Sequence, residues 1–230
     1  MGQWIQLTAA DGVQIPAWVA KPEGPVHGAV VVAQEIFGVN AHIQAVADRF
    51  AARGFMAIAP ALFERVQPGV DLGYTGDDMK AGMGLKTAAE ALPGAGVLGD
   101  VQAAAQWIQK ESGQKVGMVG FCWGGLVTWR AAEQLPELSA AVCYYGGGMT
   151  TEGERVRKPA CPVMAHFGTQ DHFIPMDSVQ AFSQAQPQVQ VHVYEANHGF
   201  NCDLRGSYDE ASALQARDRT LAFFDQHLKA

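Results

Sequence analysis

The stretch Val119-Gly120-Phe121-Cys122-Trp123-Gly124-Gly125 contains the pattern G-x-C-x-G. It follows the apolar, strand-like residues 115–119 and precedes the helix-like residues 124–135. A strand, a sharp turn and a helix in this order are typical of a nucleophile elbow, here with cysteine where serine is more usual. The flanking glycines leave room for the strained backbone of such a turn. The turn also places the Cys122 sulfur at a helix N-terminus, where the dipole favours a thiolate.

Apolar runs and amphipathic segments alternate along the rest of the chain. We expect strands at residues 13–20, 28–34, 55–59, 115–119, 138–145, 162–167 and 189–194. We expect helices at residues 40–54, 100–110, 124–135 and 175–186, and a closing helix with Leu214, Leu221, Phe224 and Leu228 on one face. Pro16 favours an edge position for the first strand. This alternation predicts an α/β fold, a mostly parallel sheet with helices on both faces in a three-layer sandwich.

Residues 64–96 interrupt the alternation. They are rich in glycine and carry Tyr74, Lys80 and Lys86. We interpret them as a partly helical excursion over the functional site. Because neither a repeat nor a linker composition divides the chain, we expect one domain over residues 1–230.

Composition excludes several classes of function. The chain has 230 residues, of which 48% are hydrophobic and 17% charged, and a formal net charge of −7. This charge argues against nucleic acid or an anionic membrane surface as a partner. Neither a signal peptide nor an apolar run of the ~18 residues that a membrane span needs is visible. Four cysteines without a C-x-x-C pair favour a reduced, cytoplasmic protein, expected as a monomer or small homo-oligomer.

An acid and a histidine follow Cys122 in the chain, each directly after an expected strand. Asp171 follows residues 162–167, and His198 follows residues 189–194. The order nucleophile, acid, histidine is that of the alpha/beta-hydrolase fold. Each of these residues, considered singly, has a structural explanation. Cys122 would be a small core residue, Asp171 a turn residue and His198 a structural histidine. Because all three residues directly follow expected strands, we favour a triad in which His198 transfers the proton and Asp171 orients the imidazole ring of His198. His172 is the alternative histidine.

The chain resembles the dienelactone hydrolase family, a cysteine-nucleophile branch of the alpha/beta hydrolases, over essentially its whole length. The residues that carry the resemblance are Gln34–Gly38, Gly120–Gly125, Tyr144–Gly146, Gly168–Pro175 and His198–Phe200. The resemblance implies a triad of Cys122, Asp171 and His198 that cleaves a small lactone or ester through a thioester acyl-enzyme. It implies no cofactor and no metal, and it suggests a place in the degradation of aromatic compounds.

Three further residues receive catalytic roles. Glu35 ends the buried strand at residues 28–34, where a carboxylate is costly unless it is paired. A capping or hydrogen-bonding role is the simpler interpretation, whereas the resemblance implies that Glu35 helps to convert the Cys122 thiol to a thiolate. The backbone N–H groups of Trp123 and, by the logic of the fold and family, Ile36 are expected to hold the oxyanion.

The substrate site departs from the family pattern. Family members that hydrolyse dienelactone hold its carboxylate with arginines, one of them four residues after the histidine, where this chain has Cys202. Arg205, Lys80 and Lys86 are candidate replacements, although each is as readily a solvated surface charge, and a lysine binds a carboxylate less specifically. The remaining candidates for the pocket are Phe37, Phe173, Tyr144 and Tyr145, of which one tyrosine is expected in the core.

Two other functions stay open. The missing arginine favours a broad carboxylesterase or thioesterase without a carboxylate requirement. A non-catalytic binding protein on the same fold is the alternative of another class, and the complete triad argues against it.

Overall fold

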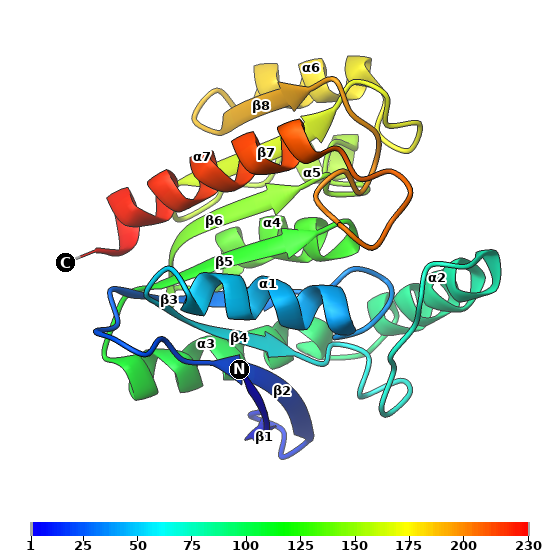
Figure 1. Ribbon diagram of the computed structural model, residues 1–230. Coiled ribbons are helices and arrows are strands. Elements are labelled where there is room, and N and C mark those ends of the chain that lie inside the picture. Colours follow the sequence, from blue (N-terminus) through cyan, green and yellow to red (C-terminus); the bar gives the residue numbers. More distant parts are fainter. Residues whose placement is uncertain (1, 230) are drawn as a thin grey trace.

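The computed structural model describes residues 2–229, and all its strands join one eight-stranded sheet (Figure 1). The order across the sheet is β1-β2-β4-β3-β5-β6-β7-β8, and every pair from β4 onward is parallel. The strands are β1 Gln3–Thr8, β2 Gln14–Ala20, β3 Gly28–Ala33, β4 Phe55–Pro60, β5 Val116–Phe121, β6 Leu138–Tyr144, β7 Val163–Gly168 and β8 Gln190–Tyr194. The expected α/β fold with a mostly parallel sheet is therefore confirmed.

Helices cover both faces of the sheet. They are α1 Ala41–Ala51, α2 Gly76–Glu90, α3 Gly96–Ser112, α4 Trp123–Gln134, α5 Glu152–Arg155, α6 Met176–Ala185 and α7 Glu210–Leu228. Helices α1 and α7 pack on one face, and α3 and α4 pack on the other (Figure 1). Helix α6 packs beside α4, because the centres of the Trp129 and Phe182 rings lie 5.2 Å apart. None of the helices in residues 2–229 is both long and apolar enough to cross a bilayer.

The central strands are the apolar runs of the sequence. Every residue of β3, β4 and β5 is buried, which is typical of parallel strands covered on both faces. Strands β3 and β5 are neighbours, and Ala33 pairs with Gly120 at their carboxyl ends. The loops that follow these strands therefore meet at one edge of the sheet, where functional residues of α/β folds gather.

The hairpin at the N-terminus differs from the sequence interpretation. Strand β2 is not an edge strand, because it pairs with both β1 and β4. Ala61 N donates to the Pro16 carbonyl on the β4 side of the strand. The N–H that proline lacks would point to the same side. The β2–β4 register begins one residue later, at Ala17 and Pro60, so the missing N–H lies just outside it. The edge is β1, which the sequence did not reveal because only Leu7 of this strand is buried.

The excursion at residues 64–96 contains α2, a helix of 15 residues, with turns on either side of it. Thr75 caps it, accepting from Asp78 N at 3.2 Å, while Asp78 Oδ2 accepts from Thr75 N at 2.9 Å. This reciprocal capping box supplies a start signal that glycine-rich composition hides. Two of the turns of α2 reach the candidate site, as described below.

Candidate active site

Cys122 lies at the sharp turn between β5 and α4. Its backbone has φ 56° and ψ −117°, a conformation that only a tightly supported turn holds for a residue with a side chain. A Cβ at Gly120 would come within 2.0 Å of Gly124 O, and a Cβ at Gly124 within 2.4 Å of Ala33 O. Both glycines are therefore required by the close approach of backbone segments. The result is a half-buried thiol at the N-terminus of α4.

His198 and Asp171 form a hydrogen-bonded pair next to this turn. His198 Nδ1 donates to Asp171 Oδ2 at 2.7 Å, and Asp171 Oδ1 accepts from Phe173 N at 2.8 Å. Both side chains are buried. Burial lowers the pKa of His198, but the negative charge and hydrogen bonding of Cys122 and Asp171 outweigh it and raise this pKa to about 10. The arrangement therefore favours an imidazolium that Asp171 holds beside Cys122.

The raised pKa of His198 predicts a pH-dependent stability. The folded state binds the proton more tightly than the unfolded chain, where the pKa stays near 6.5. The stabilisation is complete below pH 6.5 and is lost as the pH rises through about 10. We expect the Tm advantage of the wild type over His198→Gln to shrink by a few degrees between pH 6 and pH 10, measured by thermal melts. A constant difference would contradict the ion pair.

Cys122 and His198 border a cavity of about 230 Å³. Its lining includes many of the predicted site residues: Cys122, His198, Ile36, Trp123, Phe37, Phe173, Lys86 and Arg205, with Met79, Met83, Gly147 and Gly148. Met79, Met83 and Lys86 come from one side of α2, so the excursion does contribute to the site. The end of α2 is joined to the elbow, because Trp123 Nε1 donates to Glu90 Oε1 at 3.1 Å.

The oxyanion candidates lie on opposite sides of the sulfur-bearing turn. Trp123 begins α4, and the first N–H groups of a helix have no partner within the helix. Ile36 follows β3, whose neighbour in the sheet is β5. Both residues line the cavity that Cys122 borders. A carbonyl carbon attacked by the thiolate would place its oxygen near these N–H groups, a role that remains a prediction.

Glu35 and Arg205 form an ion pair at the base of the cavity. Arg205 Nη1 donates to Glu35 Oε1 at 3.1 Å, and the two side chains are 12% and 1% exposed. The Arg205 guanidinium lies 5.7 Å from the ring centres of both Phe37 and Tyr74. Although burial lowers the pKa of Arg205, the charge of Glu35 raises it above its usual value. Arg205 is therefore a charged, largely buried group in the cavity that Cys122 borders.

A second group of buried polar side chains lies behind this ion pair. The ligand atoms of Glu35, His42 and Cys202 lie within 4.8 Å of one another. Glu35 Oε2 and His42 Nε2 have no hydrogen-bond partner in the described structure, and Cys202 Sγ donates to Tyr74 Oη at 3.3 Å. Oxygen, nitrogen and sulfur donors could in principle hold Zn²⁺. Because Arg205 already neutralises Glu35, we keep the expectation that the enzyme uses no metal.

His42 and Tyr74 belong to this group although the sequence interpretation gave them no role. His42 donates from Nδ1 to Asp203 Oδ1 at 3.3 Å, and burial lowers its pKa. In the sequence, only the position of His42 on the buried side of α1 could have indicated that it belongs to this group. Tyr74 lies in the excursion, where no periodicity shows which side chains point inward.

Four of the predicted substrate-binding residues do not line the cavity. Lys80 is exposed on α2, and Tyr144 points away from the site, with its hydroxyl 2.7 Å from Thr220 Oγ1 on α7. Tyr145 is buried with its ring 5.1 Å from that of His198, so it supports the triad from behind. Cys202 lies behind the ion pair. The position predicted to have lost its arginine is thus filled by a thiol, while Arg205 reaches the cavity from three residues further along.

Comparisons with known proteins agree with this geometry. Residues 15–228 match the model of the dienelactone hydrolase family. A carboxymethylenebutenolidase of Pseudomonas putida is 34% identical, with 95% of this chain and 94% of the relative covered. A Synechocystis protein provisionally named carboxymethylenebutenolidase is also 34% identical, with the same coverage. A crystal structure of a provisionally named dienelactone hydrolase from Klebsiella pneumoniae superposes with a TM-score of 0.84 at 32% identity, covering 99% of both chains.

Proposed function

Because the chain belongs to the dienelactone hydrolase family and is a hydrolase acting on esters, we propose that its substrate is a small lactone or ester that carries a carboxylate. We further propose that Cys122, His198 and Asp171 cleave it through a thioester acyl-enzyme. The observation that supports the substrate class is the buried guanidinium of Arg205 in the cavity that Cys122 borders. A guanidinium offers a planar set of donors that matches a carboxylate.

The chemistry proceeds in two steps. The Cys122 thiolate attacks the carbonyl carbon, and the N–H groups of Ile36 and Trp123 hold the resulting oxyanion. The carbon–oxygen bond to the leaving alcohol breaks, and the His198 imidazolium gives its proton to that oxygen. In a lactone the released hydroxyl remains attached to the acyl group. Water, deprotonated by His198, then attacks the thioester and releases the acid together with the thiolate.

Arg205 links substrate recognition to Glu35. One Arg205 nitrogen donates to Glu35, whose second oxygen has no hydrogen-bond partner in the described structure. A substrate carboxylate that reaches Arg205 competes with Glu35 for the same donors. Glu35 then becomes available to accept the proton of the Cys122 thiol. This competition explains how a resting thiol would become reactive only when an acidic substrate arrives.

The substrate class is tested by steady-state hydrolysis of dienelactone beside the neutral ester p-nitrophenyl acetate. We expect wild type to prefer dienelactone, and Arg205→Gln to lower kcat/KM for dienelactone by about 10- to 100-fold, the loss of a charge-assisted contact. The neutral ester should change less than about threefold. Lys80→Gln, an exposed cation outside the cavity, is the matched control and should change neither.

The opposite result supports the second candidate function. If wild type cleaves only the neutral ester and Arg205→Gln leaves dienelactone hydrolysis unaffected, the enzyme is a carboxylesterase or thioesterase without a carboxylate requirement. The apolar lining from Phe37, Phe173 and α2 suits such substrates. Failure to hydrolyse either ester would contradict the triad itself.

Glu35→Gln tests the role of the buried carboxylate. Gln keeps the size and one acceptor, so the fold should persist, but it cannot take a proton from Cys122. We expect kcat for dienelactone to fall by about 100-fold, the lower end of the range for a lost acid–base group, with a smaller change in KM. Unchanged kcat with an unchanged thermal melt would reduce Glu35 to a purely structural partner of Arg205.

We also propose that the enzyme works in a reducing compartment. All four cysteines are free thiols, and two of them, Cys122 and Cys161, are only half buried. An oxidising environment would expose the nucleophile to irreversible oxidation.

A further inference from the structure

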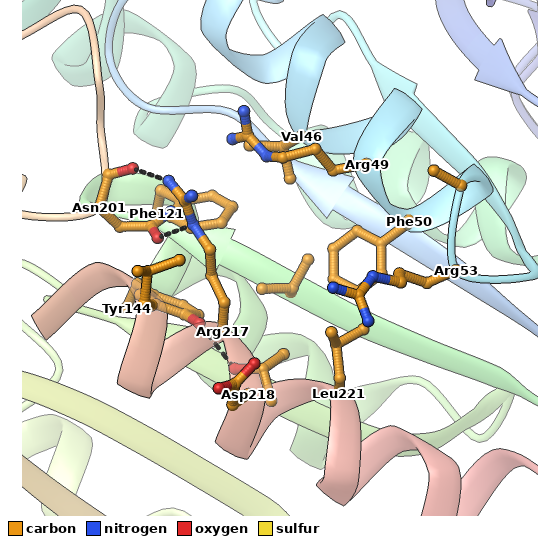
Figure 2. A pocket seen from close by; sticks show the side chains of 14 residues that line it. Val46, Arg49, Phe50, Arg53, Phe121, Tyr144, Asn201, Arg217, Asp218 and Leu221 are labelled. Atoms are coloured by element: carbon orange, nitrogen blue, oxygen red, sulfur yellow. Dashed lines mark hydrogen bonds between the residues drawn. The ribbon is translucent and has the colours of Figure 1, made fainter. Parts of the chain in front are cut away.

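A second cavity lies between α1 and α7, on the face of the sheet opposite α3 and α4 (Figure 2). Its volume is about 230 Å³, and it shares no lining residue with the catalytic cavity. Phe121 and Tyr144 form its floor, while Phe50 on α1 and Leu221 on α7 contribute apolar walls. A largely apolar, partly open cavity with a few polar groups at its margin is typical of a site for a small molecule.

The polar groups of this cavity are strongly biased towards positive charge. Arg49 extends from α1, Arg53 from the turn that follows α1 and Arg217 from α7, whereas Asp218 is the only acidic residue in the lining (Figure 2). This concentration is notable because the chain as a whole carries a net charge of −7. A cavity with this lining would attract an anion, and the exposed surface of the protein would not.

The three guanidinium groups are incompletely neutralised. Arg217 donates to the side chain and backbone oxygens of Asn201, at 2.7 and 3.0 Å, and both acceptors are uncharged. Arg53 is exposed and makes no ion pair within residues 2–229. Arg49 has one long contact, 3.6 Å to Asp203, and its Nη2 atom is buried without a partner in the described structure. Neither the neutral acceptors of Arg217 nor the single long contact of Arg49 cancels the positive charge at the margin of the cavity.

Electrostatic repulsion between the arginines also favours the binding of an anion in this cavity. Burial lowers the pKa of Arg49, and the positive charge of Arg217 lowers it further. Two cations held near each other in a partly dry site would be stabilised by an anion between them. A carboxylate fits because each guanidinium can donate two parallel hydrogen bonds to its oxygens.

We propose that this cavity is a second binding site, for a small carboxylate with an aromatic or alkyl body. The body would lie on Phe121 and Tyr144, and the carboxylate would bind between Arg49 and Arg217, with Arg53 at the entrance. The proposal concerns binding only and is independent of the function proposed for the catalytic cavity.

Isothermal titration calorimetry with 3-phenylpropionate tests the site. Two matched probes separate its parts: 3-phenylpropionamide lacks the charge, and acetate lacks the ring. We expect 3-phenylpropionate to bind the wild type at least tenfold more tightly than either. Arg49→Gln and Arg217→Gln should each weaken this binding at least tenfold, whereas Lys80→Gln, an exposed cation outside both cavities, should leave it unchanged.

Several outcomes would overturn the proposal. No detectable binding of 3-phenylpropionate at millimolar concentration would do so, as would equal binding of acetate or of the amide. Loss of binding in Arg205→Gln but not in Arg49→Gln would assign the anion to the catalytic cavity instead. Arg217→Gln removes bonds to Asn201 and can perturb the fold, so thermal melts accompany each variant. Arg53→Gln, an exposed substitution, provides an independent test and should weaken binding several-fold.

Discussion

Cys122→Ala is expected to lower kcat for p-nitrophenyl acetate by about 10⁴- to 10⁶-fold, the loss found when a covalent nucleophile is removed from a triad. Alanine keeps the backbone of the elbow but leaves His198 without an atom to deprotonate. The residual rate would come from the oxyanion donors and substrate binding. Steady-state kinetics at enzyme concentrations high enough to detect such a rate provide the measurement.

Cys161→Ala is the matched control for this loss. Cys161 is also a half-buried free thiol, but it lies before β7, and burial raises its pKa to about 11. A thiol with a raised pKa is a weak nucleophile at neutral pH. We expect this variant to keep wild-type kcat. A Cys122→Ala variant with more than about a tenth of wild-type activity would remove the thioester mechanism.

His198→Gln is expected to lower kcat by about 10⁴-fold or more, because it removes the group that moves the proton in both steps. His172→Gln is its matched control, since His172 is exposed and lies next to Asp171 in sequence. The control should stay within about twofold of wild type, as is usual for a surface substitution. The kinetics of both variants with p-nitrophenyl acetate decide between the two histidines.

Alkylation by iodoacetamide gives a second readout of the same pair. The raised pKa of His198 keeps its imidazole protonated at neutral pH, and an imidazolium would stabilise the negative charge of Cys122 when its thiol ionises. Without it, the thiol should react more slowly at pH 7, even though alkylation needs no proton transfer to substrate. Equal alkylation rates in wild type and His198→Gln would mean that Cys122 does not depend on this histidine for its ionisation.

The elbow and the order of the strands could be predicted from sequence because they depend on local requirements. Gly120 and Gly124 are needed where backbone segments approach within contact distance, and such a need is visible in the residues themselves. Apolar runs such as residues 28–33 became buried strands because no other arrangement removes so much apolar surface from water. Asn40 likewise caps α1, accepting from Ile43 N at 3.4 Å.

The substrate side of the site could not be predicted in the same way. Lys80 and Lys86 are equally charged and lie on one helix, yet only Lys86 lines the cavity. Tyr144 and Tyr145 are adjacent, and only Tyr145 packs against His198. Which of two neighbouring side chains faces the site depends on the angle at which an element crosses the sheet, and this angle is set by distant contacts.

By itself, the sequence determined the α/β fold, the place of Cys122 at the elbow and the order of Cys122, Asp171 and His198 along the chain. Only the tertiary structure decided that Arg205 pairs with Glu35, 170 residues away, and that Arg49, Arg53 and Arg217 surround a second cavity. The reason is physical. Strands, helices and tight turns follow from the residues within them, whereas charged side chains from distant elements meet only where the packing of the core brings their backbones together.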